Sequence, residues 1–229
     1  ADRIRDEKVK VLRALRPLDP KHAAKDSVRG RYTAGTINGQ PAQAYQPPEG
    51  SEAETFVGVT AHIDNWRWAG VPFHLVTGKR LPCRSTQVVI TLKPVSHWLF
   101  DKPSRGQAQP NRITLQLQPN ENIQLGLLSS LAGPEWGALE LQPLALELSV
   151  PAGQQRRIAY ERLFLDALSG NSALFVRADE VRAAWAWTDS VLAAWQQAGL
   201  AMGSYPAGQW GPQRAAQFLP ANLLEPSLP

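Results

Sequence analysis

The chain has 229 residues, of which 43% are hydrophobic and 19% charged, and it carries a formal net charge of +4 at pH 7. These values are typical of a soluble globular protein with a sizeable core. No apolar run reaches the roughly 20 residues that cross a membrane, and the charged N-terminus is unlike a signal peptide. The single cysteine, Cys83, excludes an internal disulfide framework and favours a reducing compartment, so we expect a cytoplasmic protein.

The positive charge is concentrated at the start of the chain. Residues 1–31 carry a net charge of +5 and the remaining residues a net charge of −1. A basic segment can attract nucleic acid or small anions, but acidic residues are interleaved here, which favours a solvated helix face. The eight tryptophans do not alternate with basic residues along any strand, so we predict neither a nucleic-acid partner nor a membrane partner.

The first predicted element is a helix over residues 3–16. Ile4, Val11 and Leu15 form an apolar stripe at helical spacing, and Pro17 ends the helix. Because the chain opens directly on this helix, we expect a fragment of a longer protein. A short strand or turn over 28–34 follows.

The middle of the chain is dominated by strand signals, after a loop at 38–53 that is rich in Gly, Gln, Pro and Ala. The predicted strands are 54–63, 71–76, 87–93, 112–118, 122–128 and 138–150. Pro143 marks a bulge or a sheet edge. Successive strands with short links predict a large, mostly antiparallel sheet.

Two helices close the chain. Residues 159–170 are apolar on most sides and end at Gly170, which predicts a buried helix. The second predicted helix, Asp179–Gln197, has an apolar stripe wide enough to lie on a sheet, and an irregular tail follows from residue 200. The stripe consists of Val181, Ala184, Trp185, Thr188, Val191, Leu192 and Trp195. Strands followed by helices predict an α+β fold with the helices packed on one sheet face.

The stretch WRWAGVPFHLVTGKRLPCR, residues 66–84, is the main candidate for a binding site. A Walker loop needs a glycine five places before Gly-Lys and a Ser or Thr after it, but this chain has Phe73 and Arg80 there. No dinucleotide-binding glycine fingerprint is present either. Lys79, Arg80 and Arg84 could hold a phosphate or sugar hydroxyls, although a solvated charged turn is the commoner explanation of such a cluster.

No metal or thiol chemistry is predicted. None of the histidines has metal-ligand spacing, and no catalytic motif surrounds Cys83, which we interpret as an inert thiol. The histidines are His22, His62, His74 and His97. Asn65 and its polar neighbours beside Trp66 and Trp68 indicate either an interface network or a turn cap.

Nine sequence blocks resemble a known family when they are taken in order. They are IRDEKVKVLRALRP, VRGRYTAG, ETFV, IDNWRWAGVPF, TGKRLP, NRITLQLQPNE, AYERLFLDAL, ALFVRADEVRAAW and YPAGQWGP. Together they resemble the C-terminal domain of glucose-6-phosphate dehydrogenase of the bacterial type. The resemblance covers nearly the whole chain, so we interpret residues 1–229 as one such domain.

The resemblance implies a two-domain oxidoreductase. In the family an N-terminal Rossmann domain binds NADP and carries the catalytic histidine, whereas the C-terminal domain supplies a large sheet that forms the dimer and closes one side of the substrate site. This chain lacks the glycine-rich turn and the histidine block, so we expect that the N-terminal domain is absent here. Hydride transfer needs a general base and a held nicotinamide, and we therefore predict that the chain alone is inactive.

The whole enzyme would oxidise glucose 6-phosphate to 6-phosphogluconolactone and reduce NADP, the reaction of the pentose phosphate pathway. Its expected partners are its own N-terminal domain and further copies of itself, as a homodimer or tetramer built through the sheet. The alternative hypothesis is a stand-alone, non-catalytic assembly or regulatory protein derived from the same domain, which would keep the sheet and the dimer surface.

The resemblance assigns three substrate-binding residues. Lys79 matches the lysine of the family's Gly-Lys, Arg84 matches the basic residue five positions later, and Gln118 matches a glutamine near the sugar. Such groups would hold the sugar phosphate and align its reacting carbon. No catalytic, cofactor-binding or metal-binding residue is expected in this chain.

Three departures from the family pattern concern a second nucleotide. Val76 and Gln116 stand where the family commonly has arginine, and Ile158 stands where it has aspartate. In animal enzymes these positions help to hold a structural NADP. We therefore predict that no structural NADP binds this domain.

Overall fold

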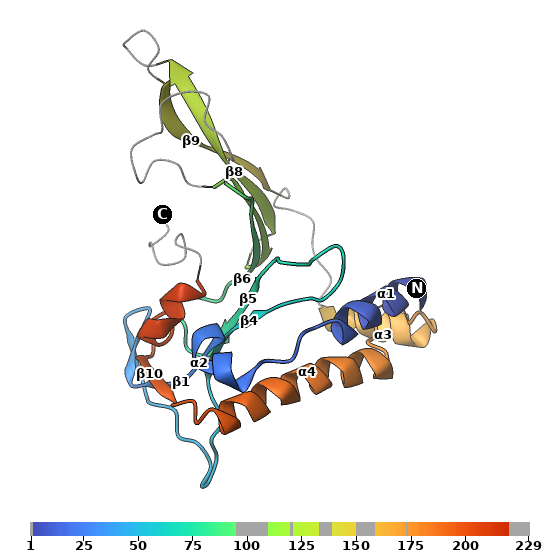
Figure 1. Ribbon diagram of the computed structural model, residues 1–229, viewed down its shortest axis with the longest axis vertical. Helices are drawn as coiled ribbons and strands as arrows, with labels where there is room; N and C mark the ends of the chain where they lie inside the picture. Colours follow the sequence, from blue (N-terminus) through green and yellow to red (C-terminus); the bar gives the residue numbers. More distant parts are fainter. Residues whose placement is uncertain are drawn as a thin grey trace. The chain divides into compact units, whose positions relative to one another are not determined.

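The structure is a computed structural model that describes residues 2–94, 110–119, 121–132, 139–149, 159–172 and 174–219. The chain divides into two compact units, and each is described by itself (Figure 1). The first unit comprises Ala1–Pro82 and Arg156–Pro229, and the second comprises Cys83–Gln155.

The helices of the described residues all lie in the first unit. They are α1 (Asp2–Arg13), α2 (Ala23–Asp26), α3 (Ala159–Leu168) and α4 (Ala178–Gln197), with two 3-10 segments, η1 (Pro20–His22) and η2 (Gln213–Gln217).

The strands in the described parts of the chain form two four-stranded sheets and one small hairpin. The first sheet has the order β10-β1-β4-β5, in which β1 and β10 are parallel and the other pairs antiparallel. Its strands are β1 (Ser27–Thr33), β4 (Phe56–Ala61), β5 (Phe73–Gly78) and β10 (Gly203–Pro206), and β2 (Gly35–Ile37) pairs with β3 (Gln40–Ala42). The second sheet is antiparallel throughout, in the order β6-β7-β8-β9. Its strands are β6 (Thr86–Thr91), β7 (Arg112–Gln118), β8 (Asn122–Ala132) and β9 (Leu139–Ser149).

The predicted α+β class and the antiparallel pairing are confirmed, but the strands are divided between two sheets, not joined in one. The break lies between β5 and β6. Arg80 there has a positive φ of 53°, which turns the chain away from the extended direction. Pro82 follows, and a proline offers no amide hydrogen for a sheet ladder.

Both faces of the first sheet are covered, because successive residues of β4 point to opposite sides. Val57 packs against a cluster that includes Val191 and Trp195 of α4. Phe56 belongs to a second cluster with Tyr205 and Phe218. The prediction that α4 lies on one face is confirmed, and the C-terminal segment covers the other face.

The predicted stripe of the first helix is wrong in part. The structure buries Val9 and Arg5 of α1, whereas Ile4 is 67% exposed. The buried face is set by a guanidinium, since Arg5 donates to Ser172 Oγ at 3.2 Å and to Phe175 O at 3.1 Å. A periodicity of apolar residues could not indicate this face.

The two C-terminal helices also differ from the expectation. In α4 the predicted residues Val191 and Trp195 are buried, but Trp185 near the start of the helix is exposed. The prediction that α3 is buried is wrong, because Phe164 and Leu168 are exposed. Both helices end near glycines with positive φ, Gly170 and Gly199, as the sequence predicts.

Two segments expected to be irregular contain strands. The predicted loop at 38–53 includes β3, and the tail after residue 200 includes β10, which pairs with β1 from Gly30↔Gly203 to Thr33↔Pro206. Such short strands contain Gly or Pro and show no alternation. Their pairing is therefore decided by the partner strand.

The segment around Trp66 is a turn, which confirms the turn-cap alternative. Asn65 Oδ1 accepts a hydrogen bond from the Trp68 backbone N–H at 2.9 Å, and Trp68 packs edge-on against Phe73 with ring centroids 5.3 Å apart. Trp66 itself is fully exposed and lies outside the core.

The register of the second sheet gathers its apolar residues on one face. Ile90 lies opposite Ile113, Ile113 opposite Leu125, and Leu125 opposite Leu146, so this row crosses all four strands. Pro143 lies on β9, the edge strand, as the sequence predicts. In the described parts of the chain, no helix combines the length and apolarity required to span a bilayer.

Candidate functional site

Lys79 comes directly after β5 and is held by its main chain. Its N–H donates to the carbonyl oxygen of Thr55 at 2.7 Å, and its own carbonyl oxygen accepts from the Tyr205 hydroxyl at 2.7 Å. Thr55 precedes β4 and Tyr205 lies in β10. Two strands far apart in the sequence therefore fix the backbone of this lysine.

Tyr205 is the central residue of this arrangement, and its role was not predicted from the sequence. Its side chain is 1% exposed, and its hydroxyl lies 3.1 Å from both Thr55 O and Thr55 Oγ1. Burial raises the pKa of Tyr205, so the hydroxyl stays protonated and can serve as a donor. The block YPAGQWGP was the available signal, but its role depends on contacts with β1 and β4.

The turn after β5 is further restrained at Gly78 and Arg80. A Cβ on Gly78 would lie 2.8 Å from the Phe56 ring and 3.0 Å from Leu81, so the site requires glycine. Arg80 has a φ of 53°, and its carbonyl oxygen accepts from the Gly208 N–H at 2.8 Å. A non-glycine residue in this region is strained, and the surrounding hydrogen bonds hold it there.

The side chains of Lys79 and Arg80 are exposed beside this rigid backbone. Among the described residues, neither forms an ion pair within 4.0 Å. Two cations on a fixed turn can bind an anionic group without first breaking an internal contact. The turn therefore has the chemistry of an anion site.

Arg84 and Gln118 lie together at one end of the second sheet. Thr86 begins β6, two residues after Arg84, and pairs with Gln118 of β7, whose Oε1 is 3.5 Å from Thr86 Oγ1. The register shifts between Thr86 and Gln87, so β7 has a bulge at this end. Bulges are frequent where a strand re-aims a side chain near a functional site.

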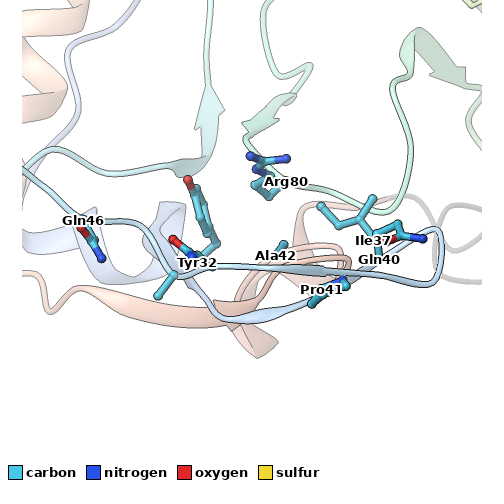
Figure 2. Close-up of a pocket in the computed structure, with 9 residues that line it drawn as sticks. Tyr32, Ile37, Gln40, Pro41, Ala42, Gln46 and Arg80 are labelled. Carbon is cyan, nitrogen blue, oxygen red and sulfur yellow. The ribbon is translucent and has the colours of Figure 1, made fainter.

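One cavity of about 550 Å³ borders the turn on its Arg80 side. Tyr32, Ile37 and the segment 40–46 contribute the rest of its lining, and Lys79 does not line it. Figure 2 shows Tyr32 and Arg80 on different elements, with Arg80 above the segment that carries Pro41 and Ala42 in this view. Among the described residues that line it, Arg80 is the charged one, so the cavity favours neutral or anionic groups.

The remaining candidates show structural roles. Nδ1 of His74 lies 3.1 Å from Thr60 Oγ1, and burial, aided by His62, lowers the pKa of His74. Within the described ranges, no cluster of three or more His, Cys, Asp or Glu residues could hold a metal ion. Cys83 is a free, exposed thiol. His97 and Ile158 lie outside the described residues.

Two of the family departures have local explanations. Val76 packs against the cluster that contains Phe56, so its side chain contributes to the core of the first unit. Gln116 donates to Ser85 Oγ at 3.0 Å, and so links β7 to the segment that carries Arg84. Both side chains are thus used inside the fold.

The family model described as "Glucose-6-phosphate dehydrogenase, C-terminal domain" matches residues 1–224. The chain belongs to this family. Curated relatives named glucose-6-phosphate 1-dehydrogenase include one from Rhizobium meliloti, 44% identical over 222 residues, and one from Zymomonas mobilis, 43% identical over 220 residues. The alignments cover 96% and 94% of this chain but 45% of each relative, so the chain spans less than half of their length.

Solved structures of glucose-6-phosphate dehydrogenases share the fold. The enzyme from Mycobacterium avium matches with a TM-score of 0.72 and 32% identity, over 95% of this chain and 43% of that chain. A glucose-6-phosphate dehydrogenase in complex with its substrate glucose 6-phosphate matches with a TM-score of 0.75 and 29% identity, over 95% and 44%. The predicted family and fold class are confirmed.

Proposed function

We propose that this chain is the substrate-side and dimer-forming part of an NADP-dependent glucose-6-phosphate 1-dehydrogenase. The whole enzyme oxidises glucose 6-phosphate to 6-phosphogluconolactone, and NADP takes the hydride. The match to enzymes of this name over nearly the whole chain favours this function over a stand-alone assembly protein.

The observation that carries the proposal is the fixed backbone of Lys79. A residue whose N–H and C=O are both held by neighbouring strands has a fixed Cα, so its side chain starts from a fixed point and binding costs little backbone freedom. One solved relative contains glucose 6-phosphate, whose phosphate suits an ammonium group. We assign Lys79, Arg84 and Gln118 as substrate contacts, each to be tested separately.

The cofactor belongs to the other half of the proposed enzyme. We propose that NADP binds an upstream domain that also supplies the catalytic base, and that this chain alone is inactive. Val76 and Gln116 offer no cation for a second nucleotide, so we propose that no structural NADP binds here. The free thiol of Cys83 fits a reducing compartment, and we propose a cytoplasmic location.

The proposed homodimer or tetramer is supported by the second sheet. Its apolar face is exposed on β9, where Leu146 is 47% and Leu148 63% exposed. An apolar face that extends over four strands needs a cover, and a second copy offers the same face in return.

The test of the proposed function is a kinetic comparison in the full-length protein. Lys79→Ala should raise KM for glucose 6-phosphate about 10- to 140-fold, equivalent to about 1.5–3 kcal/mol for a hydrogen bond to a charged group. KM for NADP should stay within about twofold. Lys25→Ala, another exposed lysine, is the matched control. Equal small changes in both KM values would contradict the role, and an absence of any glucose-6-phosphate oxidation would refute the function.

A further inference from the structure

The helix α3 presents an apolar surface that its own unit does not cover. Tyr160, Phe164 and Leu168 follow one another at four-residue steps and are 71%, 68% and 86% exposed. Residues at this spacing lie on one side of a helix. The half-buried side chains of the helix, which include Leu163 and Asp166, lie outside this row. The apolar side of this amphipathic helix therefore faces outward.

Two further apolar side chains that follow α3 in the chain are also exposed. Val176 in the connection is 67% exposed, and Trp185 on α4 is 59% exposed. We call Tyr160, Phe164, Leu168, Val176 and Trp185 the α3 surface. An aromatic side chain buries about 150–250 Å² in a contact, so the three aromatic residues supply an area near the lower limit of an interdomain interface, about 600 Å².

The first helix of the chain, α1, is hydrogen-bonded to the connection between α3 and α4, which also carries Val176 of the α3 surface. Arg5 of α1 donates to Ser172 Oγ and to Phe175 O in the connection between α3 and α4. Arg177 Nη2 donates to Asp6 Oδ1 at 2.8 Å, and α1 packs along α4 (Figure 1). The start of α1 and the α3 surface thus belong to one anchored region.

The matched family model is a C-terminal domain, and the chain covers only 45% of its relatives. In those relatives the rest of the protein therefore precedes the position of α1. We propose that the α3 surface is the docking site for this upstream part of the full-length protein. In a full-length protein of this kind the upstream part joins at α1, whose Arg5 and Asp6 contact the connection between α3 and α4. The inference rests on the proposed function only in taking this chain as part of a longer enzyme.

The proposal is tested by hydrogen exchange of the full-length protein. The amides of α3 should be protected, and Phe164→Asp should speed their exchange and that of one upstream peptide about tenfold or more, because a buried aromatic contact is replaced by a charge. Trp66→Asp is the matched control, since Trp66 is a fully exposed aromatic residue outside the α3 surface, in the turn before β5. It should leave both peptides unchanged.

A second, milder variant tests whether general misfolding explains the effect of Phe164→Asp. Leu168→Ala should speed exchange in the same two peptides by a smaller factor while β4 stays protected. Upstream peptides that do not respond to either variant would overturn the proposal. So would protection of α3 that vanishes when the protein is diluted to a monomer, because a second copy would then be the occupant. The exchange readout does not depend on activity, so a failure of glucose-6-phosphate oxidation would be seen separately.

Discussion

The two sheets of this protein are built from similar strands but are buried differently. The first sheet has a cluster on each face, one with Trp195 of α4 and one with Phe218. In the second sheet the row that includes Ile90 and Leu146 is exposed, and among the described residues of that sheet Thr114 is the buried one. The first sheet therefore completes its own core, whereas the second sheet leaves an apolar face for another surface.

This difference separates two uses of a sheet. A sheet covered on both faces can hold loop backbones rigidly, and the turn with Lys79 is attached to it by Thr55 and Tyr205. A sheet with one open apolar face is suited to association. Changes in the first sheet should therefore affect stability and the lysine turn, and changes in the second sheet should affect association.

The largest effect on stability is expected when a buried side chain of the first sheet is truncated. Phe56→Ala removes a ring that is 1% exposed and should lower the free energy of unfolding by about 3–5 kcal/mol. Leu146→Ala, in protein dilute enough to be monomeric, should cost about 0.5 kcal/mol or less, because that side chain is solvated. Urea denaturation measures both. Equal losses would show that the second sheet has a closed core after all.

Association through the second sheet should be sensitive to which face receives a charge. Leu146→Glu places a carboxylate on the apolar face and should weaken self-association by about 2 kcal/mol, roughly 30-fold in the dimer dissociation constant. Ala145→Glu places the same charge on the opposite face and should leave it unchanged. Light scattering and sedimentation report the mass, and a wild-type protein that is monomeric at high concentration would end the dimer proposal.

The link from the first sheet to the lysine turn is tested at Tyr205. Tyr205→Phe removes the hydroxyl that donates to Lys79 O, whereas Thr55 O keeps the Lys79 N–H as its donor, and the change should cost about 1–2 kcal/mol of stability. In the full-length enzyme it should also raise KM for glucose 6-phosphate. Tyr45→Phe is the control, on a half-buried ring 5.7 Å from Tyr32. A loss of stability with an unchanged KM would show that the hydrogen bonds of Tyr205 support the fold but not substrate binding.

The smallest effect concerns pH. The pKa of His74 is lowered in the folded protein, so the unfolded chain binds a proton more readily as the pH falls through about 6.5. The stabilisation from neutral His74 is thus present above that pH and lost below it. Thermal unfolding between pH 7.5 and 5.5 should show a smaller decrease in Tm for His74→Gln than for wild type. An identical decrease would show that His74 does not contribute to the pH dependence.

Local sequence patterns predicted the elements well where a period or a stop signal was strong. The strand at 112–118 agrees with β7 in both limits, and the helix predicted at Asp179–Gln197 begins one residue earlier, at Ala178. The failures have one cause. Arg5 is buried in place of Ile4, and Phe164 is exposed. Both outcomes depend on which neighbouring element packs against the helix, and a helical period does not contain that information.

The candidate site was predictable only in part. The residue types of Lys79 and Arg84, and the family they resemble, could be identified from short motifs because charge and spacing are local properties. The role of Tyr205 could not, since its hydroxyl acts on residues 126 and 150 positions away. Likewise, the bulge beside Gln118 appears only when β6 and β7 are paired.

The sequence by itself determined the family, the class of fold, most strand positions and the basic turn after β5, because these follow from composition, periodicity and motif. Tertiary structure alone decided that the strands divide into two sheets, that β10 joins β1, and that Tyr205 fixes the backbone of Lys79. It also decided that the apolar side of α3 faces outward. The physical reason is that pairing and burial are properties of two surfaces, and each stretch of sequence describes only one of them.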